Sequence, residues 1–182
     1  MNSNHLIKIV KSFENEKYDF LGVFLNDDVS VLKNLWRNNC FFIVNTITLD
    51  EIDHMGHWVL FFVRNSTLNL ICSYSIPAEI HSGVIYKYFT LSPYKTKFYL
   101  RKPLQSPDSL MCGGYVLFFA HHLSENIPMR QIMQKFSPNL KKNDVFIDNF
   151  IKKKYLSEMC RIDLCPARMF NSVCSKQCKC IT

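Results

Sequence analysis

The sequence predicts one α+β domain, with strands mainly in the first half of the chain and helices mainly in the second. Strand-like apolar runs gather between residues 40 and 74, and apolar residues recur at helical spacing after residue 107. Of the 182 residues, 48% are hydrophobic and 20% are charged, which is enough apolar surface for one core and excludes a disordered chain. Only 5 Gly and 7 Pro exclude a collagen-like or low-complexity class.

The first half of the chain contains two predicted helices and three predicted strands. Apolar residues at mixed helical spacing predict a helix over residues 6–13. Asp27-Asp28-Val29-Ser30 is typical of a helix cap and predicts a short helix through about Asn38. β-branched and aromatic runs predict strands over residues 40–46, 57–63 and 68–74, and residues 64–67 form a hairpin turn between the last two.

The second half is mainly helical. Residues 84–101 are aromatic and β-prone, with a break near Ser92-Pro93, and predict extended structure. Pro107-Asp108-Ser109 predicts the start of a helix from about Leu110 to Ser124, because Pro107 blocks upstream continuation and Asp108 or Ser109 can cap. Two more helices are predicted over residues 129–136 and 144–159. We therefore expect a folded domain over residues 1–159 and a cysteine-rich, basic tail over 160–182.

The net charge of +7 is concentrated at one end of the chain. Residues 1–126 carry 11 basic and 11 acidic side chains, whereas residues 127–182 carry 11 basic and 4 acidic ones. A basic final third indicates either a polyanionic or acidic partner or a solvated basic face.

No membrane or export signal is visible, because the N-terminus lacks a long apolar segment and the apolar runs are too short to span a bilayer. We therefore expect a soluble protein made in a reducing compartment. There, eight cysteines favour thiol chemistry, a metal or buried thiols over a disulfide framework.

Three side chains together suggest acyl transfer by a thiol. Cys112 falls in the first turn of the strongest helix, where the helix dipole lowers a thiol pKa. His57 could take the thiol proton, and the Gln105 amide with the Cys112 N–H could bind an oxyanion. Gly113 and Gly114 would let a substrate backbone approach. Each residue alone has an ordinary structural explanation, such as a core thiol or a surface imidazole.

In these segments the sequence resembles the adenovirus-type cysteine proteases (the adenain family), which occur in adenovirus-like and polinton-like viruses. The matching segments are Gly56-His57-Trp58 with Val59-Leu60-Phe61, and residues 105–113 from Gln105 to Cys112-Gly113; residues 22–24 and 41–46 also fit. The resemblance implies a papain-like fold of rearranged order, with a mixed sheet on a central helix that starts at the nucleophile. It implies Cys112 as nucleophile, His57 as base and acid, Gln105 as oxyanion donor, and Trp58 beside the imidazole.

One position departs from this family. The family has Asp or Glu after the strand that follows the histidine, then a small residue, an aromatic residue and Gly. Here that position falls on Cys72, or on Ser73 with another gap placement. Neither is a carboxylate, so we expect a Cys–His dyad or an impaired enzyme. A Ser73 hydroxyl or a water could orient His57, and no motif places Asp53 or Glu79.

The resemblance implies a viral cysteine endopeptidase that processes virion precursor proteins, located in the virion and in the host nucleus or cytoplasm. A catalytically impaired descendant, acting as a structural or nucleic-acid-binding virion protein, is the alternative. A deubiquitinase-like or SUMO-protease-like enzyme is a third, since those share the fold and residue order.

No cofactor is expected for the chemistry itself. By resemblance, DNA and a viral peptide are candidate activators, and Lys152-Lys153-Lys154 with the basic final third fit sequence-independent DNA binding. The tail cysteines Cys160, Cys165, Cys174, Cys178 and Cys180 leave zinc, disulfides and spare thiols as open alternatives.

Overall fold

The structure is a computed structural model that describes residues 3–13, 17–28, 36–48, 50, 56–81 and 83–161, with backbone only for Phe13 and residues 156–161. Its helices and strands run in the order α1 (Ser3–Phe13), β1 (Asp19–Leu25), β2 (Cys40–Asn45), β3 (Trp58–Arg64), β4 (Thr67–Ile71), α2 (Gly83–Leu91), β5 (Thr96–Tyr99), α3 (Cys112–Ser124), α4 (Met129–Met133) and α5 (Leu140–Arg161).

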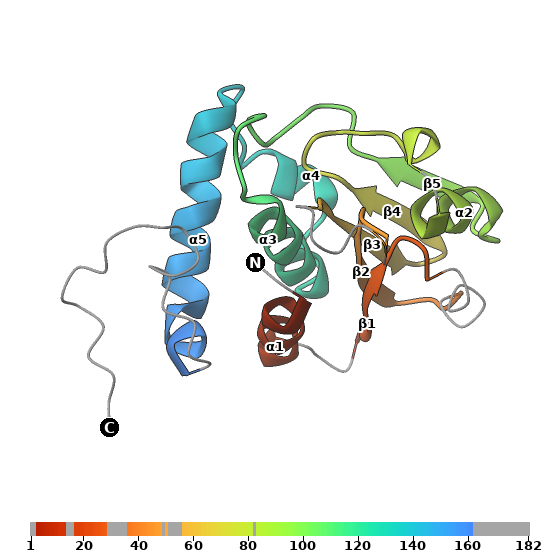
Figure 1. Cartoon of the computed structure of the whole chain (residues 1–182), viewed down its shortest axis with the longest axis horizontal. Coiled ribbons are helices and arrows are strands. Elements are labelled where there is room, and N and C mark those ends of the chain that lie inside the picture. Colours follow the sequence, from red (N-terminus) through yellow and green to blue (C-terminus); the bar gives the residue numbers. More distant parts are fainter. Residues whose placement is uncertain are drawn as a thin grey trace.

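The five strands form one mixed sheet in the order β1-β2-β3-β4-β5 (Figure 1). The β2–β3 and β3–β4 pairs are antiparallel, and the outer pairs β1–β2 and β4–β5 are parallel. The predicted hairpin turn is confirmed, because Arg64 pairs with Thr67 and the two residues between them have positive φ. The mixed sheet of the expected fold is therefore present.

Both faces of the sheet are buried, which explains the continuous apolar runs in its central strands. Along β3, Leu60 and Phe62 face a core formed with α1, α3, α4 and α5. The alternate residues Val59, Phe61 and Val63 face a second core formed with α2. This period of two is the ordinary alternation of a β-strand.

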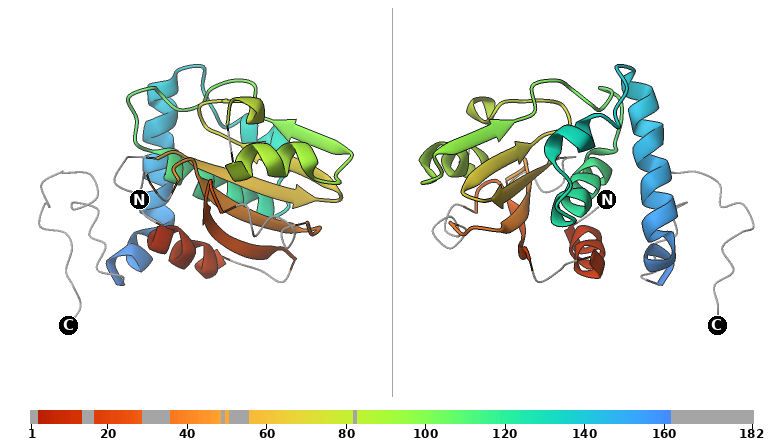
Figure 2. Two further views of the ribbon diagram at one scale, coloured as in Figure 1. Left: turned by 45° about the vertical axis from the view of Figure 1, so that its right-hand side comes forward. Right: turned by 180° about the vertical axis from the view of Figure 1, so that it is seen from behind.

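The helix that begins at Cys112 lies between the sheet and α5 (Figure 2). All of its residues from Gly113 to Ser124 are buried. A Cβ added at Gly114 would lie 2.8 Å from Ile147 Cγ2 on α5 and 3.0 Å from the Met111 side chain. Gly114 therefore allows the two helices to approach closely, and its small size serves this packing instead of the substrate approach expected from the sequence.

Several predicted elements need correction. Residues 83–91 form the helix α2, not a strand, because Val84, Ile85, Tyr88 and Phe89 occupy one helical face that packs on the sheet. Burial of this face overrides the β propensity of the residues. The strand β1 was not predicted. Most of the short helix expected before Asn38 lies outside the described residues, and residues 36–39 are not helical.

The predicted C-terminal helices are present with shifted ends. The first begins at Cys112 instead of Leu110, the second ends at Met133, and the third begins at Leu140. The tail from residue 162 onward lies outside the described residues, so its zinc and disulfide alternatives stay predictions. None of the helices in the described ranges is long and apolar enough to cross a membrane.

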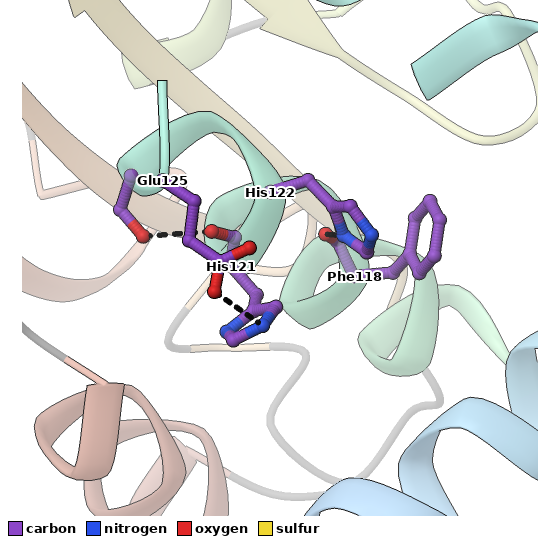
Figure 3. A network of polar contacts seen from close by, with 5 residues as sticks. Phe118, His121, His122 and Glu125 are labelled. Atoms are coloured by element: carbon purple, nitrogen blue, oxygen red, sulfur yellow. Dashed lines mark hydrogen bonds and ion pairs between the residues drawn. The ribbon is translucent and has the colours of Figure 1, made fainter. Parts of the chain in front are cut away.

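A compact group of aromatic and polar side chains closes the C-terminal end of α3 (Figure 3). The His122 Nδ1 atom lies 2.8 Å from the Phe118 carbonyl oxygen, and His121 Nε2 lies 3.3 Å from Glu125 Oε1. Phe150 of α5 contacts both imidazole rings. Burial lowers the pKa of both histidines, which favours their neutral forms in this apolar setting.

Candidate active site

Cys112 is the first residue of α3, and its side chain is half-buried. Met111 occupies the N-cap position without a side-chain cap, and the Ser109 hydroxyl accepts the Met111 N–H instead. Backbone N–H groups of Trp58 and Gly113 favour the thiolate, yet burial outweighs them and raises the thiol pKa. The pKa lowering expected from the helix N-terminus is therefore wrong for this resting state, in which the thiol is protonated.

His57 lies directly before β3 and is held by the end of β2. Its backbone N–H donates to Thr46 Oγ1 at 2.8 Å, and its carbonyl accepts the Thr46 N–H at 2.8 Å. Burial, with a smaller effect of the nearby His81, lowers the pKa of His57 to about 4. The imidazole is therefore neutral at pH 7, as a general base must be.

Cys72 lies against this imidazole, with its Sγ 3.3 Å from His57 Nε2. The other ring nitrogen, Nδ1, is buried and has no hydrogen-bond partner among the described residues. A buried N–H needs an acceptor more than a nitrogen lone pair needs a donor, so the favoured tautomer carries its proton on Nε2, toward Cys72. That tautomer leaves the Nδ1 lone pair available to accept a proton.

The other residues considered as replacements for the acid do not take this position beside His57 in the described structure. The Ser73 hydroxyl donates to Gln105 Oε1 at 2.6 Å, so the expectation that it could orient His57 is wrong. Glu79 is exposed, and Asp53 lies outside the described residues. Backbone N–H groups of residues 74–76 favour a negative charge on the Cys72 sulfur, but burial dominates and raises the thiol pKa.

Gln105 is 1% exposed, and both hydrogens on its side-chain amide nitrogen are donated in hydrogen bonds. Its Nε2 donates to the Ser109 carbonyl at 2.6 Å and to the Tyr74 hydroxyl at 3.0 Å. Its own backbone N–H donates to the Ser73 carbonyl. The residue predicted to stabilise an oxyanion thus lies close to the start of α3, with both amide hydrogens already paired.

The segment around Gln105 is anchored from α5. Asn143, which is 1% exposed, donates to the Leu104 carbonyl at 3.0 Å, and the Tyr115 hydroxyl lies 2.9 Å from that same oxygen. The Asp144 carboxylate accepts hydrogen bonds from the Ser106 hydroxyl and the Tyr115 hydroxyl. A buried, fully paired network of this kind rigidifies the segment on which the site depends.

Tyr74 is a site residue that the sequence reasoning did not assign. Its ring centroid lies 4.7 Å from that of His57, and its hydroxyl donates to the Ser109 carbonyl at 2.9 Å. The signal was present as the aromatic residue that follows the acid position. Trp58, expected beside the imidazole, is buried in the core on the α3 side. Ser75, at the family's Gly position, has φ 60°, and its N–H donates to the Cys72 carbonyl.

Comparison with solved structures identifies the architecture. A structure of the SUMO protease Ulp1, whose catalytic cysteine is oxidized to a sulfenic acid, matches 87% of this chain and 78% of its own chain, with a TM-score of 0.50 and 16% identity. The fold is that of a Ulp1-like cysteine protease. This agrees with the expected papain-like, adenain-like architecture, in which a mixed sheet packs on a helix that begins at the nucleophile position.

A second match covers 90% of this chain and 96% of the central domain of Lpg1148, an uncharacterized protein from Legionella pneumophila, at a TM-score of 0.46 and 13% identity. No protein-family model matches this sequence, and no curated protein sequence matches it.

The side chains at this site are of the types that acyl transfer by a thiol needs. The Cys112 thiol lies against the backbone N–H of Trp58, the residue after His57, and Tyr74 packs on the His57 ring, where α3 and β3 begin and β4 ends. Within the described ranges, no group of three or more His, Cys, Asp or Glu side chains is arranged to hold a metal ion.

Proposed function

We propose that this protein is a cysteine endopeptidase in which Cys112 is the nucleophile and His57 is the general base and acid. The observation that carries the proposal is the thiol of Cys112 at the first residue of α3, against the backbone N–H of Trp58, the residue that follows His57. The Ulp1-like fold supports it.

The reaction begins from a neutral pair. His57 Nδ1 takes the Cys112 thiol proton as the sulfur attacks a peptide carbonyl, and the carbonyl electron pair moves onto oxygen. The resulting imidazolium gives its proton to the leaving amine when the C–N bond breaks. Water then attacks the thioester carbonyl while His57 takes a proton from it. The C–S bond breaks, and His57 returns the proton to the Cys112 sulfur. Because the thiol starts protonated, proton transfer and attack are coupled in the first step.

In this proposal Cys72 takes the place of the usual acid and acts as a positioning residue. Its sulfur accepts the Nε2–H of His57 and holds the ring in one tautomer. A neutral thiol stabilises the imidazolium less than a carboxylate does, so we expect slow turnover. The backbone N–H groups of residues 74–76 that face its sulfur would also donate to a carboxylate oxygen at this position.

The substrates are proteins. We propose virion precursor proteins as the specific class, on the strength of the sequence motifs around His57 and Cys112. SUMO-like or ubiquitin-like conjugates are the competing class, which the Ulp1-like fold favours. Sequence-independent DNA binding is proposed for the exposed lysines of α5, which are Lys141, Lys142, Lys152, Lys153 and Lys154.

The test is cleavage of a mixed peptide library and of ubiquitin-type conjugates by the wild-type protein, with and without DNA. Cys112→Ala should lower cleavage by at least about 10⁴-fold, because the nucleophile is lost. Cys40→Ala, which removes a fully buried thiol on β2, is the matched control and should cleave like wild type. Equal cleavage by wild type and Cys112→Ala, or none by either, contradicts the proposal.

A further inference from the structure

Tyr74 connects the proposed base to the segment before the nucleophile. Its ring packs on His57, with ring centroids 4.7 Å apart. Its hydroxyl lies 3.0 Å from Gln105 Nε2 and 2.9 Å from the Ser109 carbonyl oxygen, three residues before Cys112. The side chain is half-buried, whereas Gln105 behind it is 1% exposed. Of these two residues, Tyr74 is therefore the more exposed.

Gln105 has no amide hydrogen to spare. One hydrogen on Nε2 is donated to the Ser109 carbonyl and the other to the Tyr74 hydroxyl, while Oε1 accepts from Ser73. Donation to a substrate oxygen would break one of these buried hydrogen bonds and move the amide out of its network. Such a loss is unfavourable because it leaves a buried group unpaired.

The Tyr74 hydroxyl can donate without that cost. Its single hydrogen points to the Ser109 carbonyl, which also accepts from Gln105 and so keeps a partner when the hydroxyl turns away. Rotation about the Cζ–O bond moves no heavy atom. The hydrogen bond that the hydroxyl oxygen accepts from Gln105 also makes its O–H a stronger donor.

The hydroxyl stays protonated in the working pH range. Burial, followed by the nearby Cys112, raises the pKa of Tyr74 above its ordinary value. The group is therefore a neutral O–H donor at pH 7.

We propose that the Tyr74 hydroxyl donates a hydrogen bond to the oxyanion that forms when Cys112 attacks, and that Gln105 is a positioning residue acting through it. The inference rests on the proposed endopeptidase function. In the step concerned, the Sγ–C bond forms, the carbonyl π pair moves to oxygen, and the thiol proton goes to His57. Tyr74 keeps its own proton and hydrogen-bonds to the oxyanion until the C=O bond is restored.

The decisive variant is Tyr74→Phe, which removes one oxygen atom and keeps the ring on His57. We expect kcat/KM for a cleaved peptide to fall about 10²- to 10³-fold. The rate at which iodoacetamide alkylates Cys112, followed by mass spectrometry of its peptide, should change less than about 3-fold, because alkylation forms no oxyanion. Tyr86→Phe, on the exposed face of α2, is the matched control and should change neither rate.

A double-mutant cycle tests the role given to Gln105. Gln105→Ala should lower kcat/KM in the wild-type background but add little to Tyr74→Phe, because both residues act through one hydrogen bond. A further large loss in the double variant would make Gln105 a donor in its own right and overturn the inference.

Other outcomes are equally informative. If Tyr74→Phe retains a third or more of wild-type cleavage, or loses cleavage and alkylation in parallel, the hydroxyl does not serve the oxyanion and the inference fails alone. A wild-type protein that cleaves no peptide or conjugate overturns the endopeptidase function and this inference together.

Discussion

The two ends of α3 place similar side chains in opposite roles. At the N-terminal end, Cys112 and His57 are the proposed reactive pair, and the Nδ1 atom of His57 has no hydrogen-bond partner in the described part of the chain. At the C-terminal end, His121 pairs with Glu125 and His122 with the Phe118 carbonyl (Figure 3). Phe150 contacts both imidazole rings. Both ends bury imidazoles, and what distinguishes the N-terminal end is a neighbouring thiol, since the Cys72 sulfur lies 3.3 Å from His57 Nε2.

The largest expected effect comes from a substitution in the aromatic packing around α3, which should lower stability and leave cleavage nearly unchanged. Phe118 is fully buried and its ring contacts five other rings, including His122 and Phe150. Phe118→Ala should lower the free energy of unfolding by about 3–5 kcal/mol, because it leaves a cavity. Under native conditions kcat should stay within about 2-fold of wild type, since Phe118 lies six residues after Cys112 in α3.

Denaturant unfolding and peptide cleavage on the same samples check this prediction. Phe98→Ala, whose side chain is 57% exposed on β5, is the matched control and should shift unfolding by less than about 0.5 kcal/mol. A large fall in kcat with Phe118→Ala would mean that the two ends are coupled.

A substitution of Cys72, beside the proposed base, should instead change cleavage. Cys72→Ala should lower kcat/KM about 10- to 100-fold, because His57 loses the group that fixes its tautomer. Cys72→Asp should cleave at least as fast as wild type, because a carboxylate stabilises the imidazolium. The measurement is kcat/KM for a cleaved peptide, with Cys40→Ala as the control variant. If Cys72→Ala matches wild type, His57 works without a positioning partner.

The last expected effect concerns pH: stability should fall between pH 7 and pH 5, whereas cleavage should not. Burial lowers the pKa of His5, His57, His81, His121 and His122 in the folded state. The unfolded chain therefore binds more protons below about pH 6.5, so stability is complete above that pH and is lost as the pH falls. Between pH 7 and pH 5 we expect His57 alone, with a pKa of about 4, to account for a loss of about 2 kcal/mol in the free energy of unfolding, and the other histidines add to it.

Cleavage should persist over the same interval, because the pKa of His57 is about 4 and its imidazole stays neutral at pH 5. Urea unfolding and kcat/KM at pH 7, 6 and 5 check the divergence. His122→Asn, which keeps a donor for the Phe118 carbonyl, should flatten the pH dependence of stability. Cleavage that falls with a midpoint near pH 6.5 would contradict it.

The sequence was most informative where one pattern had one structural meaning. Continuous apolar runs identified β2 and β3, and the Pro107-Asp108-Ser109 turn located the start of α3 within two residues, although the N-cap is Met111 and not Asp108 or Ser109. It was least informative where tertiary contacts decide. The aromatic segment 83–91 became a helix only because its buried face meets the sheet.

The site followed the same rule. Cys112, His57 and Gln105 were proposed from their residue types and order, and Cys72 from the acid position that the family resemblance implies. Tyr74 and the anchoring pair Asn143-Asp144 depend on contacts 31 to 39 residues apart, which local patterns do not report. The saturation of the Gln105 amide is likewise a property of three segments together.

The hydrogen bonds from Asn143 and Asp144 to residues 104–106 also set a time order. During synthesis Cys112, the proposed nucleophile, leaves the ribosome before the helix that fixes the neighbouring Gln105 segment. A nascent chain that ends before residue 140 holds Cys112 and His57 yet lacks this support. Cleavage should therefore begin after α5 has docked, which protects a partly made chain from its own thiol.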